Sequence, residues 1–124
     1  MLPDVTSGRN RVKHRIPLRV VFYRDERDPT IVVAHCLEFD LMGDGTTREE
    51  ALSMLAGAIL LQLEASAESN NPANLFTPAD AEYHRMFFEG ADVAVGELGL
   101  RTAVNGYLVE SVQAREYSRE LIPT

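Results

Sequence analysis

The sequence predicts an α+β fold: a three-stranded antiparallel sheet, a capped amphipathic helix across one face, a second short helix and a late returning strand. Two observations indicate it. Residues 17–43 contain three segments typical of strands, separated by turn-forming residues. A strong helix pattern follows from Thr47 onwards. With 124 residues, 45% of them hydrophobic, the chain has the size of one domain, because two halves would each bury too little surface.

Three strands are expected, over residues 17–23, 31–37 and 38–43. Asp28-Pro29 favours a turn between the first two, and Asp44-Gly45 is expected to end the sheet because glycine readily adopts a positive φ. The segment 31–37 is apolar on both of its faces, which indicates burial on both sides, by the second helix or by another copy of the chain. On that basis we predict a homodimer or a higher homo-oligomer.

The main helix is predicted to begin after Thr47 and to run to about residues 66–68. Thr47 and Glu50 form the pattern of a capping box: the Thr47 side chain accepts the Glu50 N–H, and the Glu50 side chain reaches back to the start of the helix. Apolar residues at helical spacing form one stripe, suited to lying across a sheet: Ala51, Leu52, Leu55, Ala58, Ile59 and Leu63.

The rest of the chain predicts a second helix over 77–90, with Thr77 as its cap, Pro78 in its first turn and Gly90 past its end. Asn105-Gly106 predicts a turn into a late strand over 107–117, and residues 98–104 could form the other arm of a hairpin. That late strand is expected to join the sheet or a partner protomer.

We expect three parts in the chain: a mobile basic arm (1–16), an α+β domain (17–90) and a C-terminal extension (91–124). The formal net charge is −7, and residues 17–124 alone carry −10. Such a surface makes nucleic acid an unfavourable partner and favours a basic protein. There is no long apolar run or secretory signal, so we expect no membrane association and a cytoplasmic location.

Residues 17–68 resemble the HicB family of type II antitoxins. The matching positions begin in the second strand and end in the main helix; they are Val32, Ala34, Gly45, Thr47, Glu50, Ala51, Leu52, Leu55 and Ala58. The resemblance implies a partial double-stranded-RNA-binding-domain-like or ribonuclease-H-like fold. It also implies a non-catalytic protein that neutralises a small basic HicA-like mRNA-cleaving toxin, or an orphan domain of that family. Many members also carry a C-terminal DNA-binding module, which we do not expect in residues 91–124 because they contain several glycines and few basic residues.

The candidate site residues follow from these patterns. The fold motif consists of Gly45, Thr47, Glu50, Ala51 and Leu52. Contact with a basic partner is expected from four carboxylates: Glu49, Glu64, Glu68 and Asp40.

No catalytic, metal or cofactor site is predicted. His35 and Cys36 are adjacent in a strand, so they point to opposite faces and cannot form a nucleophile–base pair within one chain. Asp40, Asp44 and Glu49 lack the spacing of a calcium loop. Two alternatives stay open: an oligomeric scaffold or small-ligand module, and a small hydrolase that uses Cys36 with a histidine from a partner chain.

Overall fold

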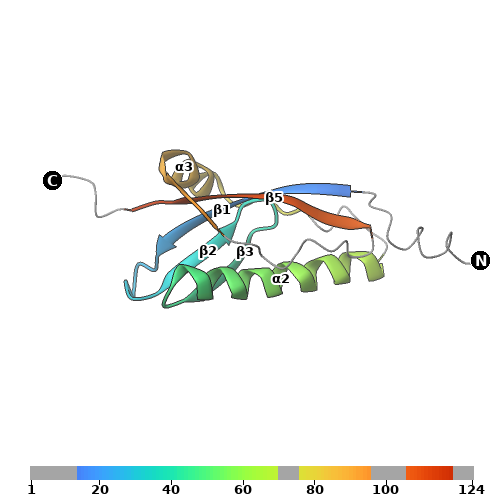
Figure 1. The fold of residues 1–124 in the computed structure, drawn as a ribbon, viewed down its shortest axis with the longest axis horizontal. Helices are drawn as coiled ribbons and strands as arrows, with labels where there is room; N and C mark the ends of the chain where they lie inside the picture. The colour runs from blue at the N-terminus through green and yellow to red at the C-terminus, as the bar shows by residue number, and fades with distance from the viewer. Residues whose placement is uncertain (1–13, 70–75, 96–105, 119–124) are drawn as a thin grey trace, which may run out of the picture.

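The computed structural model describes residues 14–69, 76–95 and 106–118. The described residues form one five-stranded mixed sheet in the order β3-β2-β1-β5-β4, with α2 and α3 on opposite sides of it (Figure 1). In chain order the elements are β1 (His14–Arg24), β2 (Val32–Cys36), β3 (Leu41–Gly45), α2 (Arg48–Ser69), α3 (Ala81–Glu89), β4 (Ala91–Val93) and β5 (Tyr107–Glu116). The α+β class is confirmed, but the sheet is larger than the three strands expected.

The three predicted strands are antiparallel neighbours, with Val21 opposite His35 and His35 opposite Met42. β5 corresponds to the predicted late strand and lies next to β1, but parallel to it. The short strand β4, which we did not predict, pairs antiparallel with β5. The late strand thus joins the chain's own sheet, between β1 and β4.

β1 begins earlier than expected. Residues 14–16, assigned to the basic arm, are part of the strand and pair with the start of β5, where the rings of His14 and Tyr107 stack at 5.0 Å. The pairing shifts register between Ile16 and Pro17, in keeping with the missing N–H of proline. The remainder of the predicted arm, residues 1–13, lies outside the described residues, as does the segment 98–104.

The third strand is displaced from its expected place. Residues 38–40 form a turn in which Asp40 has a φ of 54°, so β3 starts only at Leu41. β3 then continues through Asp44-Gly45, where we expected the sheet to end. Gly45 has no positive φ; a Cβ there would come within 2.5 Å of the Glu50 Cβ. The reason for this glycine is therefore close packing of the helix on the strand.

The second helix starts later than predicted. Thr77 and Ala79 donate backbone hydrogen bonds to the carbonyls of Glu38 and Leu37, which holds this segment against the loop after β2. Asp80 has an extended backbone (φ −61°, ψ 156°), so α3 begins at Ala81, and Asp80, not Thr77, is the residue at its N-cap.

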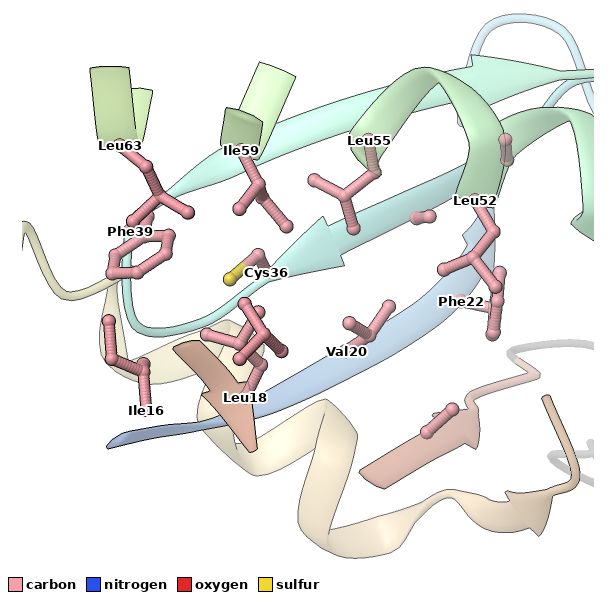
Figure 2. Close-up of a cluster of buried hydrophobic side chains, with 14 of the residues drawn as sticks. Ile16, Leu18, Val20, Phe22, Cys36, Phe39, Leu52, Leu55, Ile59 and Leu63 are labelled. Atoms are coloured by element: carbon pink, nitrogen blue, oxygen red, sulfur yellow. The ribbon is translucent and has the colours of Figure 1, made fainter. Parts of the chain in front are cut away.

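The main core lies between the sheet and α2. Side chains from β1, β2 and α2 meet there, and Figure 2 shows Leu55, Ile59 and Leu63 pointing from the helix toward Val20, Cys36 and Leu18. The predicted stripe of α2 is buried, apart from Ala58, which is half-buried.

The opposite side of the sheet has a smaller core, formed by Val21, Leu37, Ala79, Met86 and Phe87. Together the two cores bury all five residues of β2 within one chain. The apolar character of this strand therefore needs no second copy, and the homodimer stays a prediction without its original reason.

Candidate functional site

The predicted fold motif is a hydrogen-bonded start of α2. The Glu50 N–H donates to Thr47 Oγ1 at 3.1 Å, as expected for an N-cap. The Glu50 carboxylate reaches one residue further back than the capping-box pattern implies, and accepts the N–H and the hydroxyl of Thr46 at 2.8 and 2.9 Å. The pKa of the Glu50 carboxyl is held below its ordinary value of 4.5, mainly by the hydrogen bond from the Thr46 backbone N–H and next by the one from the Thr46 hydroxyl. Ala51 and Leu52 are buried beneath the cap.

The expected partner-binding carboxylates are only partly brought together. Glu49 and Glu64 are both exposed on α2, about 22 Å apart along the helix axis at 1.5 Å per residue. Asp40 lies elsewhere, in the turn before β3, and is engaged by His35. The side chain of Glu68 lies outside the described residues.

Most of the described positive charge is already neutralised by the chain itself. Arg19 is the best-held arginine: its Nε donates to Glu38 Oε2 at 2.8 Å, while its backbone N–H donates to Glu38 Oε1 at 2.8 Å. Three further arginines pair with carboxylates: Arg15 with Glu110, Arg48 with Glu116 and Arg115 with Asp92. In contrast, Glu49 and Glu64 have no ion pair with any described residue, so α2 presents net negative charge.

The outer face of α2 has a feature that we did not predict. Large apolar side chains are exposed there: Met54 is 61% and Leu61 68% accessible, with Leu60 beside them. Only the inner stripe was recognised from the sequence. A signal was nevertheless available, since residues 51–63 contain no charged residue although one side of the helix must face solvent.

His35 occupies a polar network on the α3 side of the sheet. Its ring is 1% exposed; Nε2 lies 2.7 Å from Asp40 Oδ1, and Nδ1 lies 2.9 Å from Tyr23 Oη. In the neutral ring, Nε2–H donates to the carboxylate and Nδ1 accepts the phenol O–H. The ring of Tyr83 covers the imidazole at a centroid distance of 4.3 Å. Both imidazole nitrogens are thus hydrogen-bonded, one to the turn before β3 and one to β1, and α3 contacts the imidazole through the ring of Tyr83.

Cys36 lies in the other core, as expected from its adjacent position. Burial raises the pKa of its thiol to about 11. His35 and Cys36 therefore face opposite sides of the sheet, and the buried thiol has no base beside it among the described residues.

A cavity of about 490 Å³ lies at one end of the sheet, where β1 and β5 end and α2 begins. Its wall includes Arg24, Arg48, Glu116 and Tyr117. Both arginines are engaged, Arg48 with Glu116 at 3.0 Å and Arg24 with the Pro29 carbonyl at 3.2 Å. The cavity is large enough for a metabolite, but both arginines in its wall are already engaged, one by a carboxylate and one by a backbone carbonyl.

Within the described segments, no three His, Cys, Asp or Glu side chains come together in a way that could hold a metal ion. Neither described helix is long and apolar enough to cross a membrane. Comparisons of the chain with protein-family models, curated proteins and solved structures found no match.

Proposed function

We propose that this chain is a non-catalytic binding protein of the HicB antitoxin type, with a small basic HicA-like ribonuclease as its partner, or an orphan domain of that family. The observation that carries the proposal is the charge of α2. Its exposed carboxylates Glu49 and Glu64 lack ion pairs among the described residues, while Arg48, Arg19 and Arg115 are held by carboxylates. A surface of this kind attracts and orients a basic protein.

The order of elements supports the same proposal. Two antiparallel strand pairs, a glycine-containing edge strand and a Thr-capped helix follow one another, as in the pattern on which the resemblance to HicB domains rests. The proposed interaction needs no catalytic group, and neither Glu49 nor Glu64 takes part in the His35 network or in the core around Cys36.

Co-expression with a basic HicA-like ribonuclease tests the proposal. We expect the chain to restore growth and to elute with the ribonuclease at low salt, and the complex to weaken as salt is raised. Replacing Glu49 and Glu64 by Lys should weaken it at least tenfold. Replacing Glu82 and Glu89 on α3 by Lys makes the same change in net charge on the other side of the sheet and should have a much smaller effect. Absence of a complex at low salt would end the antitoxin proposal.

The cavity at the end of the sheet favours a second candidate, a small-ligand module. Its volume falls in the range of known ligand sites, and it lies at the carboxyl ends of two parallel strands, β1 and β5. A metabolite library screened by nuclear magnetic resonance would test it. Shifts confined to Val32, Arg48 and Tyr117 would support a ligand, and a library without such shifts would remove this candidate.

The hydrolase alternative has a direct test at Cys36. With a pKa of about 11, the buried thiol should resist iodoacetamide at pH 7.5 in the folded protein and react once urea unfolds the chain. Rapid alkylation of the folded protein would reopen the question of a reactive cysteine.

A further inference from the structure

We propose that the outer face of α2, made of Met54, Gly57, Leu60 and Leu61, is the docking surface for an amphipathic helix with an apolar centre and basic ends. The inference rests on the proposed function, because it takes the partner to be a basic protein. It adds the place of contact and the kind of element that the partner supplies.

The first argument is the exposed apolar surface. Met54, Leu60 and Leu61 are 61%, 37% and 68% accessible, and with Gly57 they lie at positions i, i+3, i+6 and i+7 on one side of the helix. The exposed apolar residues run from 54 to 61, about 10 Å along the helix axis at 1.5 Å per residue, and lie within a segment, 51–63, that contains no charged residue. Adjacent exposed apolar side chains on a charged protein are typical of a contact with another chain.

The second argument is Gly57. A Cβ built at this position meets no atom within 4 Å, so packing inside the described chain gives no reason for glycine. Glycine is also a poor residue for the middle of a 22-residue helix. Close approach of another backbone would supply the missing reason, since glycine lets two helix axes come nearer than larger residues do.

The third argument is the charge at the two ends of the face. Glu50, Gly57 and Glu64 recur at intervals of seven residues and so occupy nearly the same angular position on the helix. The apolar centre is therefore bordered by a carboxylate at each end. The nearest arginine of the helix, Arg48, is directed to Glu116.

The carboxylates at the two ends of this face favour a different protein, and not a second copy of this chain, as the partner that binds there. If two copies of α2 crossed antiparallel at Gly57, Glu50 of one would face Glu64 of the other. If they crossed parallel, each carboxylate would face itself. Both arrangements place like charges together, whereas a helix with Lys or Arg at both ends would meet a carboxylate at each end.

Synthetic helical peptides test the proposal. One 21-residue peptide carries Leu and Ala along one face of its middle turns and Lys at both ends; the other has Glu in place of Lys. Fluorescence anisotropy with the full chain should show at least tenfold tighter binding of the Lys-ended peptide at low salt, and the difference should shrink at about 0.5 M salt. Equal affinity for both peptides, or no binding of the Lys-ended one, would overturn the proposal.

A pair of matched variants locates the contact. Leu61→Gln should lower the affinity for the Lys-ended peptide at least tenfold. Phe88→Gln removes an apolar side chain that is 80% exposed on α3 and should leave the affinity unchanged. Circular dichroism checks that both variants fold. An equal loss in the two variants would show that the peptide binds non-specifically and would overturn the assignment.

Two further readouts separate the possible failures. In sedimentation, a dimer of the chain that dissociates in Leu61→Gln would assign this face to a second copy and overturn the proposal. In the growth assay, a ribonuclease neutralised equally well by Leu61→Gln would overturn the docking surface while leaving the antitoxin function intact. Peptide binding without any neutralisation of the ribonuclease would overturn the antitoxin function while leaving the docking surface intact.

Discussion

The two faces of the sheet differ in how they are held together. The α2 face is an apolar core in which the helix lies so close to β3 that a Cβ on Gly43 would stand 2.3 Å from the backbone N of Leu55. The α3 face has a smaller apolar core and, beside it, a polar network of Asp40, His35 and Tyr23. Adjacent residues of one strand, His35 and Cys36, belong to these two environments.

The α3 face also relies on arginines. The Arg115 guanidinium donates to the carbonyls of Phe87 and Phe88 at the end of α3 and lies 4.9 Å from the Phe87 ring centroid. It thereby supplies a donor to the Phe88 carbonyl and a second donor to the Phe87 carbonyl, which also accepts the N–H of the C-cap residue Gly90 at 3.2 Å. The stability of the α2 face therefore depends mainly on close packing of buried apolar side chains. The stability of the α3 face depends more on hydrogen bonds, and some of their partners are exposed enough to bond to water instead.

The largest expected effect is on the α2 face. Leu55→Ala should lower the free energy of unfolding by about 2–5 kcal/mol, since Leu55 is fully buried and its removal leaves a cavity against the sheet. Urea denaturation measures the change. The exposed residue Met54, changed to Ala on the same helix, is the control and should shift stability by less than about 1 kcal/mol.

Close packing of helix on strand predicts the next effect. Gly43→Ala should cost about 3 kcal/mol, because the added methyl group meets backbone atoms of Ala51 and Leu55 that cannot rotate away. The midpoint of thermal unfolding is the readout. A variant as stable as the natural chain would mean that α2 does not lie this close to β3.

A smaller effect is expected on the α3 face. His35→Phe keeps a ring beneath Tyr83 but removes both hydrogen bonds, and should cost about 1–3 kcal/mol. The cost is limited because the Asp40 side chain is 43% exposed and can turn to water. Asp40→Asn, which keeps an acceptor for Nε2–H, should cost less. A loss as large as that of Leu55→Ala would contradict the contrast between the faces.

The outer side of α2 offers a change in the opposite direction. Gly57→Ala should raise the free energy of unfolding by about 0.5–1 kcal/mol, because alanine is the better helix former and its methyl group meets no atom within 4 Å. Gly43→Ala is the matched comparison. Glycine-to-alanine substitution should lower stability at residue 43, which faces the inner side of α2 from β3, and raise it at residue 57 on the outer side of the helix. A loss of stability at residue 57 would show that the face is covered within the chain.

The smallest effect is a pH dependence at the start of α2. The pKa of Glu50 is lower in the folded chain than its ordinary value of 4.5, so its stabilising contribution is present above that value and is lost as the pH falls through the folded pKa. Glu50→Gln should therefore be less stable than the natural chain at pH 7, and the gap should narrow at pH 3. Urea denaturation at the two pH values would show it. A gap that is constant with pH would rule out this role for the carboxylate.

Much of the α2 face was predictable because its signals are local. The capping residues Thr47 and Glu50, and the helical spacing of Leu52, Leu55 and Ile59, depend on neighbours within one or two turns. The opposite directions of His35 and Cys36 likewise follow from the alternation of a strand.

The α3 face was less predictable because its contacts join distant residues. Nothing near Tyr107 in the chain indicates that it pairs in parallel with His14, and nothing near Thr77 shows that its N–H is bound by Glu38. Gly45 was expected to serve a turn, and the close approach of α2 to Gly43 and Gly45 was not predicted, because it exists only once helix and strand are packed.

By itself the sequence determined the class of the fold, the start and inner stripe of the long helix, and the negative charge of the chain, because propensity, periodicity and formal charge are properties of nearby residues. Only the tertiary structure decided that five strands form a mixed sheet, that Asp40 is bound by a buried histidine while Glu49 and Glu64 are not paired with described residues, and that Met54 and Leu61 remain outside. Each of these depends on which distant segments meet, and the free energy of packing that selects them is not a sum of local preferences.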